Sequence, residues 1–226
     1  MILYLRTEFK YILILPGFMR FLSVFLILSC ILFNPAMAQM AGEFNRSGYI
    51  KDLKKERKIK NAEMLTDEHS PLTAEDKPAF KELKYFKPKV SFRKEAKFER
   101  FDQATHFLMK TTTDRLPEYA LYGAVTFRHK GKTYTLNVYQ NIELLKKPGY
   151  EKYLFIPFND ETNGKETYGG GRFLDIYEND NDTLLIDFNK AYNPYCAYNH
   201  KYSCPIPPEE NNLKLKVKAG EKKWHY

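Results

Sequence analysis

Apolar and polar residues alternate along much of the chain after residue 90, and this period of two is typical of β-strands with one buried face. The alternation is clearest over 119–127 and 134–138, with apolar positions at Tyr119, Leu121, Val125, Phe127, Tyr134, Leu136 and Val138. His129-Lys130-Gly131-Lys132 lies between the two segments and has the composition of a turn. The pattern therefore predicts a β-hairpin.

Further strands are predicted on both sides of this hairpin. They are expected from Val90 through Phe98, over 105–113, 150–158, 172–177 and 183–188, and in a last segment where Leu213, Leu215 and Val217 alternate with lysines. The lysines give that last strand one basic, solvated face. Roughly seven to nine short strands predict a mostly β fold, either an antiparallel sandwich or a partly closed barrel.

Two helices are predicted ahead of the strands. Ser47–Leu65 is highly charged and has a sparse apolar side at Ile50, Leu53 and Ile59. After the break at Ser70-Pro71-Leu72, Thr73 is expected to cap a second helix, with Phe80 and Leu83 on its inner face and Lys87-Pro88 at its end.

The first 38 residues have the pattern of a secretory signal peptide. Arg20 precedes an apolar run over 21–33, and Ala36-Met37-Ala38 supplies the small residues of a cleavage site between Ala38 and Gln39. Met19 is an alternative start, and Cys30 resembles a lipoprotein cysteine, a less favoured interpretation because apolar residues continue after it. The chain is thus expected to comprise a signal peptide (1–38), a leader and basic helix (39–69) and a β-rich domain (70–226), located in the periplasm or outside the cell.

Charge is distributed unevenly in a chain whose net charge is +8. Lys51–Lys60 alone contains six basic and two acidic residues, which we interpret as a solvated helix face that makes at most a weak contact with an anionic surface. No nucleic-acid partner is expected, because the sequence has no motif of that kind.

Cys196 and Cys204 remain after removal of the signal peptide. In an oxidising compartment two cysteines usually form a disulfide, which is the favoured interpretation. The spacing Cys196-x₃-His200-x₃-Cys204 would also suit a metal site, and a cysteine beside a histidine can act as a nucleophile. No metal site and no cofactor is predicted.

Polar residues that suit a binding or catalytic site gather in 160–211. Arg172 follows three glycines and could bind a carboxylate or phosphate, although a tight turn is the simpler interpretation. Glu166 and Asp175 are candidate catalytic carboxylates beside Arg172, and Asp160 and Asp187 could each equally pair with a nearby base. The residues expected to contact a ligand are Tyr168, Arg172, Asp187, Asn189, Tyr192 and Asn193.

Three stretches of this segment, TNGKETYGGGRFLDI, DFNKAYNPYCAYN and YSCPIPPEEN, resemble the domain-of-unknown-function family 1684, and the chain is identified as an exported bacterial member of it. Phe173 and Ile206 depart slightly from the family pattern. The resemblance implies no activity and transfers no catalytic residue. Because His200 lies outside the family motif, it makes the metal and Cys–His hypotheses less favoured.

These observations lead to three hypotheses. The first is a binding or structural module built on residues 160–211, with a small polar or carbohydrate-like ligand. The alternative is an extracytoplasmic hydrolase that uses Glu166 and Asp175, with Arg172 stabilising negative charge. In the third, residues 160–211 only brace the fold, and function lies elsewhere, such as on the basic helix. The oligomeric state is not predicted.

Overall fold

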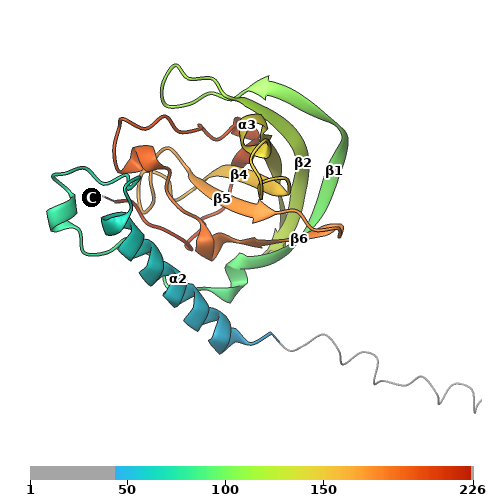
Figure 1. Ribbon diagram of the computed structural model, residues 1–226. Coiled ribbons are helices and arrows are strands. Elements are labelled where there is room, and N and C mark those ends of the chain that lie inside the picture. Colours follow the sequence, from blue (N-terminus) through green and yellow to red (C-terminus); the bar gives the residue numbers. More distant parts are fainter. Residues whose placement is uncertain (1–43, 225–226) are drawn as a thin grey trace, which may run out of the picture. The chain divides into compact units, whose positions relative to one another are not determined.

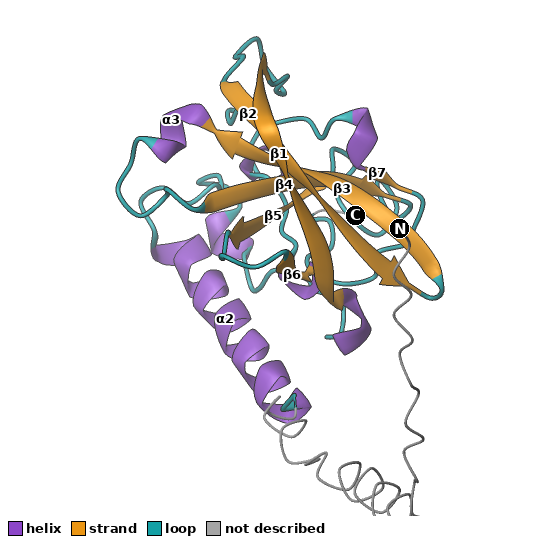
Figure 2. Cartoon of the chain, turned by 90° about the vertical axis from the view of Figure 1, so that its right-hand side faces the viewer, coloured by secondary structure: helices purple, strands orange, loops and turns teal. Residues whose placement is uncertain are grey.

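One strongly curved, mainly antiparallel sheet forms the body of the computed structural model, which describes residues 44–224 (Figures 1 and 2). Its strands are β1 (Arg93–Leu108), β2 (Glu118–His129), β3 (Lys132–Asn141), β4 (Tyr153–Asp160), β5 (Arg172–Tyr177), β6 (Thr183–Asp187) and β7 (Asn212–Leu213). They are ordered β5-β4-β3-β2-β1-β6, and β7 pairs in parallel with β4. The curved sheet forms a half-barrel. The mostly β prediction is therefore confirmed, and of its two variants the partly closed barrel fits this sheet better than the sandwich.

The predicted hairpin is confirmed as β2 and β3. Val125 lies opposite Leu136 and Phe127 opposite Tyr134, so both apolar rows face the same side of the sheet. The turn residues Lys130 and Gly131 both have positive φ, at 48° and 79°. Two such residues give a turn whose twist matches that of the strands, which fixes the pairing register.

Both faces of the middle strands are buried. Inside the half-barrel, the core includes Val125, Leu136, Val138, Leu154, Ile156, Phe158, Leu174, Leu184, Ile186 and Phe188. On the opposite face, Phe155 and Phe173 pack with Met109, Tyr119 and Tyr139 under loops that contribute Cys196 and Cys204. Since adjacent strand residues point to opposite faces, β4 and β5 supply side chains to both clusters.

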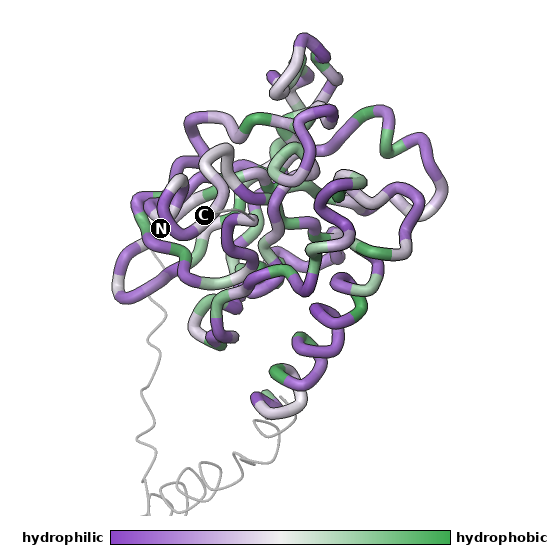
Figure 3. Tube along the Cα trace, turned by 90° about the vertical axis from the view of Figure 1, so that its left-hand side faces the viewer, coloured by the Kyte–Doolittle hydropathy of each residue, from purple (hydrophilic) through white to green (hydrophobic). Residues whose placement is uncertain are grey.

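Within residues 44–224, the one α-helix ahead of the strands is α2 (Arg46–Thr66), in a compact unit that begins at Arg46. Leu53 and Met64 are buried, and Arg57 and Lys60 are half-buried between them, so the inner face follows a spacing of three and four residues. Ile59, predicted on that face, is 48% exposed. Figure 3 shows that the helix is hydrophilic apart from a few positions. A shorter helix, α3 (Ile142–Leu145), follows β3.

The predicted second N-terminal helix is wrong. Thr73 accepts a hydrogen bond from the Asp76 N–H at 3.1 Å, but only a 3₁₀ turn, Lys77–Ala79, follows. The backbone beyond it is extended because distant groups bind it: the Leu83 N–H donates to the Asn61 side chain at 2.9 Å, and the Phe86 N–H to the Gly220 carbonyl at 3.0 Å. Tertiary hydrogen bonds thus replace helical ones.

The last predicted strand is also shorter than expected, because pairing stops at Leu213. Beyond it, Leu215 and Val217 still pack against the core. The predicted signal peptide, with Ala38, Gln39 and Cys30, lies outside the described residues. Within the described range, no helix is both long enough and apolar enough to cross a membrane.

Candidate functional site

Arg172 lies in the interior of the half-barrel and is completely buried. Its Nη2 binds the Asp160 carboxylate at 2.7 Å and the Val217 carbonyl at 2.9 Å, and its Nη1 donates to the carbonyls of Ala219 and Glu221. The preceding Gly171 has a φ of 90°, and a Cβ there would lie 2.6 Å from Pro207, so the glycine serves a tight turn. In this arrangement Arg172 anchors the C-terminal segment and has no access to a ligand.

Glu166 and Asp175 are not brought together with Arg172. The Glu166 carboxylate pairs with Lys218 at 2.9 Å, and both side chains are partly exposed. Asp175 lies three residues after Arg172 on β5, so the two side chains point to opposite faces of the sheet. Glu166 and Asp175 therefore do not share a site with Arg172, as the hydrolase hypothesis requires.

Asp187 and Asn189 hold neighbouring segments together. Asp187 accepts hydrogen bonds from the Tyr49 hydroxyl at 2.7 Å and from the Asn189 N–H at 3.0 Å. The Asn189 side chain, 1% exposed, accepts from the Lys89 N–H and donates to the Lys89 carbonyl, both at 2.9 Å. These contacts fasten α2 and the segment before β1 to the end of β6.

Asn193 belongs to a second buried network, centred on Glu221. The Glu221 carboxylate is 1% exposed and accepts hydrogen bonds from the Asn193 N–H and the Tyr198 hydroxyl, both at 2.8 Å. Lys60 of α2 lies 2.7 Å from the same carboxylate and neutralises it. The Lys60 ammonium also sits 4.8 Å from the centre of the Tyr192 ring. The basic helix therefore contributes a charge to the interior of the domain.

Cys196 and Cys204 are buried free thiols at the base of one loop. The Cys196 N–H donates to the Cys204 sulfur at 3.2 Å, and the Tyr168 hydroxyl lies 3.7 Å from the Cys196 sulfur. A hydrogen bond from Cys204 lowers the pKa of the Cys196 thiol, and the same interaction raises the pKa of Cys204. Tyr168 thus packs beside the cysteine pair.

Asp175 and Asp187 are the predicted site carboxylates that line cavities. Asp187 is held by Tyr49 and Asn189, whereas Asp175 keeps acceptor positions free. Asp175 accepts hydrogen bonds from the hydroxyls of Tyr153 at 2.7 Å and Tyr192 at 2.8 Å. Burial raises the pKa of both tyrosines, so they remain neutral donors at physiological pH. Although Asp175 is open to solvent on one side, surrounding protein atoms raise the pKa of its carboxyl as well.

The cavity beside Asp175 is termed here the aromatic pocket and has a volume of about 480 Å³. It is lined by Lys60, Phe173, Asp175, Tyr192, Pro194, Tyr195, Tyr202, Ser203 and Cys204. Tyr195 and Tyr202 form one wall, with ring centres 5.2 Å apart and planes at 72°. The pocket combines aromatic faces with one carboxylate and one ammonium group, a composition typical of small-ligand sites.

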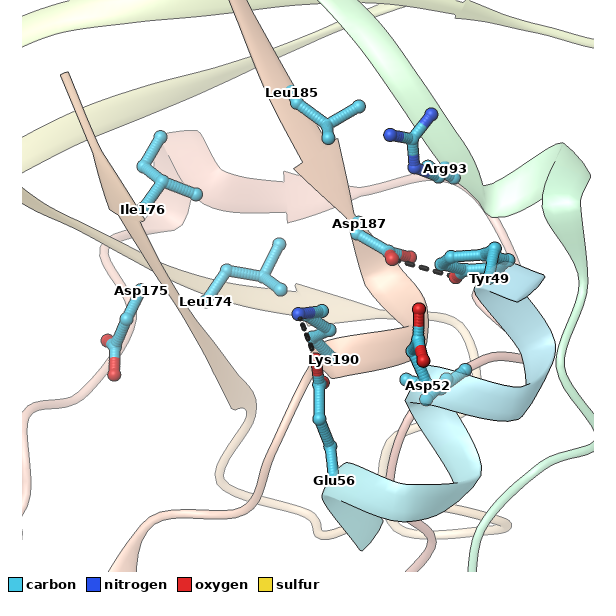
Figure 4. A pocket seen from close by; sticks show the side chains of 11 residues that line it. Tyr49, Asp52, Glu56, Arg93, Leu174, Asp175, Ile176, Leu185, Asp187 and Lys190 are labelled. Carbon is cyan, nitrogen blue, oxygen red and sulfur yellow. Dashed lines mark hydrogen bonds and ion pairs between the residues drawn. The ribbon is translucent and has the colours of Figure 1, made fainter. Parts of the chain in front are cut away.

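A second cavity of about 360 Å³, the helix groove, lies between α2 and the edge strands β5 and β6 (Figure 4). Several of its polar groups already have partners: Tyr49 binds Asp187, and Lys190 binds Glu56 at 2.9 Å. Figure 4 shows Asp175 pointing away from these pairs. We therefore choose the aromatic pocket as the candidate functional site. No group of three or more His, Cys, Asp or Glu side chains within 44–224 is placed to hold a metal ion.

Sequence reasoning found Asp175 and Tyr192 but missed Lys60, Tyr195, Tyr202 and Ser203. Three of these four lie beside the cysteines, in a segment whose sequence suggests a disulfide, a metal site or a cysteine nucleophile but not an aromatic wall. Lys60 was counted as part of a solvated basic face. Its spacing of seven residues from Leu53 and four from Met64 was the available signal that it lies on the inner side of the helix.

Comparison with known proteins finds a family model, described as a protein of unknown function (DUF1684), that matches residues 78–222. Among solved structures, the chain is similar to the solution NMR structure of an uncharacterised protein from Haloarcula marismortui. The two are 30% identical with a TM-score of 0.61, and the match covers 78% of this chain and 95% of the other. No curated protein matches the chain. The chain belongs to the DUF1684 family.

Proposed function

We propose that this protein binds a small, ring-shaped polar ligand, such as a sugar or a carbohydrate-like molecule, in the aromatic pocket. The proposal rests on the carboxylate of Asp175, which can accept further hydrogen bonds and lies at the edge of the aromatic walls. We further propose that binding takes place outside the cytoplasm, because the sequence predicts a signal peptide.

Asp175 has spare capacity to accept hydrogen bonds. An ionised carboxylate has about four acceptor positions, and Tyr153 and Tyr192 supply two hydroxyl protons between them. Ligand hydroxyl groups would complete the set. Hydrogen bonds to a charged acceptor are stronger than those between neutral groups, so this contact would fix the ligand's orientation.

The aromatic walls suit the apolar face of a ring. Tyr195 is 44% exposed, which is high for a large aromatic residue and leaves surface that a ligand would cover. Its contact with Tyr202 limits the motion of both rings, so little conformational entropy would be lost on binding. Lys60 adds a donor near the Tyr192 ring.

Because the proposed location outside the cytoplasm is oxidising, we also propose a disulfide between Cys196 and Cys204. The Cys196 N–H donates to the Cys204 sulfur, so the two residues are neighbours. The lowered pKa of Cys196 favours its thiolate, which would attack the disulfide of an oxidant; Cys204 would then displace the reduced oxidant and close the bridge. The bridge would hold Tyr202 and Ser203, which line the aromatic pocket, in place.

The hydrolase hypothesis has less support. It needs two carboxylates, or a carboxylate and Arg172, around one substrate, whereas Glu166 binds Lys218 and Arg172 binds Asp160 inside the core. The contacts of Asp187 and Asn189 are likewise structural.

A thermal-shift screen with sugars and small polar metabolites tests the proposal, followed by affinity measurements on variants. For a ligand found with the natural protein, Asp175→Asn and Tyr195→Ala should each weaken binding by about tenfold or more, since a charged hydrogen bond or a stacking surface is lost. Affinity should also fall with decreasing pH, starting above the usual Asp pKa of about 3.9, because the pKa of Asp175 is raised.

The matched control is Asp180→Asn, which changes an exposed carboxylate outside the pocket and should leave affinity unchanged. The proposal is wrong if a broad screen gives no ligand, or if every ligand found binds Asp175→Asn and the natural protein equally well.

A further inference from the structure

A third cavity, separate from the aromatic pocket, is lined by six lysines and has a volume of about 580 Å³. This lysine cleft is defined by Lys89, Lys130, Lys132, Lys214, Lys216 and Lys218. Glu161 is the one acidic residue in its lining. Such an excess of one charge in a hollow attracts ions of the opposite sign.

The fold brings these lysines together from three places in the sequence. Lys130 and Lys132 flank the glycine of the β2–β3 turn, and Lys89 precedes the 3₁₀ turn Val90–Phe92 ahead of β1. The other three follow β7, in the segment where every second residue is a lysine. A hydrogen bond from the Glu161 N–H to the Leu215 carbonyl, at 3.1 Å, holds this segment beside the end of β4.

Most of this charge is not neutralised within the described chain. Lys218 pairs with Glu166, whereas the other five lysines form no ion pair with any residue in 44–224. Like charges that share a cleft repel one another. A bound anion would remove that repulsion, and several charges on one anion would remove more of it than a single charge.

A buried histidine at the cleft supplies an independent indication of a ligand. His129 lines the cleft, is 4% exposed, and stacks on Phe92 with ring centres 4.7 Å apart. Its Nδ1 has no hydrogen-bond partner among the described residues. Buried polar atoms are usually paired, so an unpaired one beside a cavity suggests a missing partner. Burial and the charge of Lys94 lower the pKa of the His129 ring. A bound anion would favour the protonated ring and would accept a hydrogen bond from Nδ1.

We propose that the lysine cleft binds a ligand with two or more linked phosphate groups. Five lysines without an ionic partner exceed what a single phosphate would contact, and the cleft is large enough for several such groups. Single-stranded nucleic acid is a poorer fit, because such sites stack bases on exposed aromatic rings and Phe92 is buried. A membrane surface fits less well, since these lysines line a hollow rather than an amphipathic helix.

Titration calorimetry with inorganic tripolyphosphate tests this assignment. The natural protein should bind it more tightly than orthophosphate, and more weakly as salt screens the charges. Lys130→Glu/Lys216→Glu should lower the affinity by about tenfold or more, since two favourable ionic contacts become repulsive.

The control is Lys51→Glu/Lys55→Glu, which makes the same change in net charge on the exposed face of α2. It should keep the affinity within about twofold. NMR spectra of the natural protein should show shifts of the His129 ring signals and of the amides over 129–132 as tripolyphosphate is added. Both variants should retain the dispersed spectrum of the natural fold.

Equal losses of affinity in the two double variants would overturn the proposal, because overall charge rather than the cleft would then explain binding. Orthophosphate binding as tight as tripolyphosphate binding would also contradict it. So would tighter binding of a single-stranded oligonucleotide or of vesicles that contain phosphatidic acid. The aromatic pocket shares no lining residue with the cleft, so failure of one proposal leaves the other standing.

Discussion

Arg172 ties the last part of the chain to the sheet through charge and hydrogen bonds. Three carbonyl groups of residues 217–221 and the Asp160 carboxylate surround its guanidinium group. Burial lowers the pKa of Arg172, while the nearby Asp160 raises it and favours the charged form. A fully buried pair of this kind is sensitive to the loss of either partner.

We therefore predict that Arg172→Met lowers the free energy of unfolding by about 3–5 kcal/mol, because a buried carboxylate is left without its cation. Urea denaturation measures the change. The double variant Asp160→Asn/Arg172→Met should recover part of the loss, since the uncompensated charge is gone.

Lys152 provides the control, because it pairs with Asp180 at the surface, where the two side chains are 58% and 96% exposed. Lys152→Met should cost less than about 1 kcal/mol. Similar effects of the two substitutions would contradict the structural role assigned to Arg172.

At the scale of elements, α2 is attached by one narrow face. Leu53 and Met64 are its buried apolar residues, and Arg57 fills the space between them, donating to the Phe86 carbonyl at 3.0 Å. The Arg57 guanidinium also lies 4.3 Å from the centre of the Tyr85 ring. The helix therefore docks through a mixture of apolar and cationic contacts.

The orientation of α2 predicts a large loss of stability for one truncation and almost none for another. Leu53→Ala should lower the free energy of unfolding by about 2–4 kcal/mol, because it creates a cavity under the helix. Ile59→Ala, on the exposed side, should change it by less than about 0.5 kcal/mol. Chemical denaturation of both variants measures the two changes in the free energy of unfolding. A larger effect at Ile59 would mean that the helix is rotated.

The sequence predicted elements that depend on local interactions. Alternation and a short turn defined the β2–β3 hairpin, and a long charged run defined α2. The segment 73–87 was mispredicted because its backbone groups bind Asn61 and Gly220, far away in the sequence. No local pattern carries that information.

The candidate site was predictable to a similar extent. Asp175 and Tyr192 belong to motifs that are dense in polar residues. Closeness in the sequence placed Arg172 and Asp175 in one candidate site, but their odd spacing on a strand directs the two side chains to opposite faces. Tyr195 and Tyr202 could not be assigned to a pocket, because their place depends on how the loop before β7 folds back over Phe173.

For the molecule as a whole, the state of the two cysteines depends on its compartment. We predict that protein purified from an oxidising compartment carries the Cys196–Cys204 bridge, because the Cys204 sulfur already lies 3.2 Å from the Cys196 backbone nitrogen. Alkylation under denaturing conditions, followed by mass spectrometry, should label neither cysteine before reduction and both after it. Closing this short loop should stabilise the fold by about 2–3 kcal/mol.

Protein that was never exposed to a reductant but is labelled on both cysteines would disprove the bridge. A Cys196→Ser/Cys204→Ser variant provides the matched reference. It should resemble the reduced protein in thermal stability and should no longer respond to reductant.

The carbonyl groups that surround Arg172 have a consequence for how the protein matures. A ribosome synthesises β1 to β6 well before residues 217–221, so the guanidinium group would remain without its partners while those strands are being made. A half-barrel with an unsatisfied cation in its core is poorly stable, so stable folding should wait until residues 217–221 have been made.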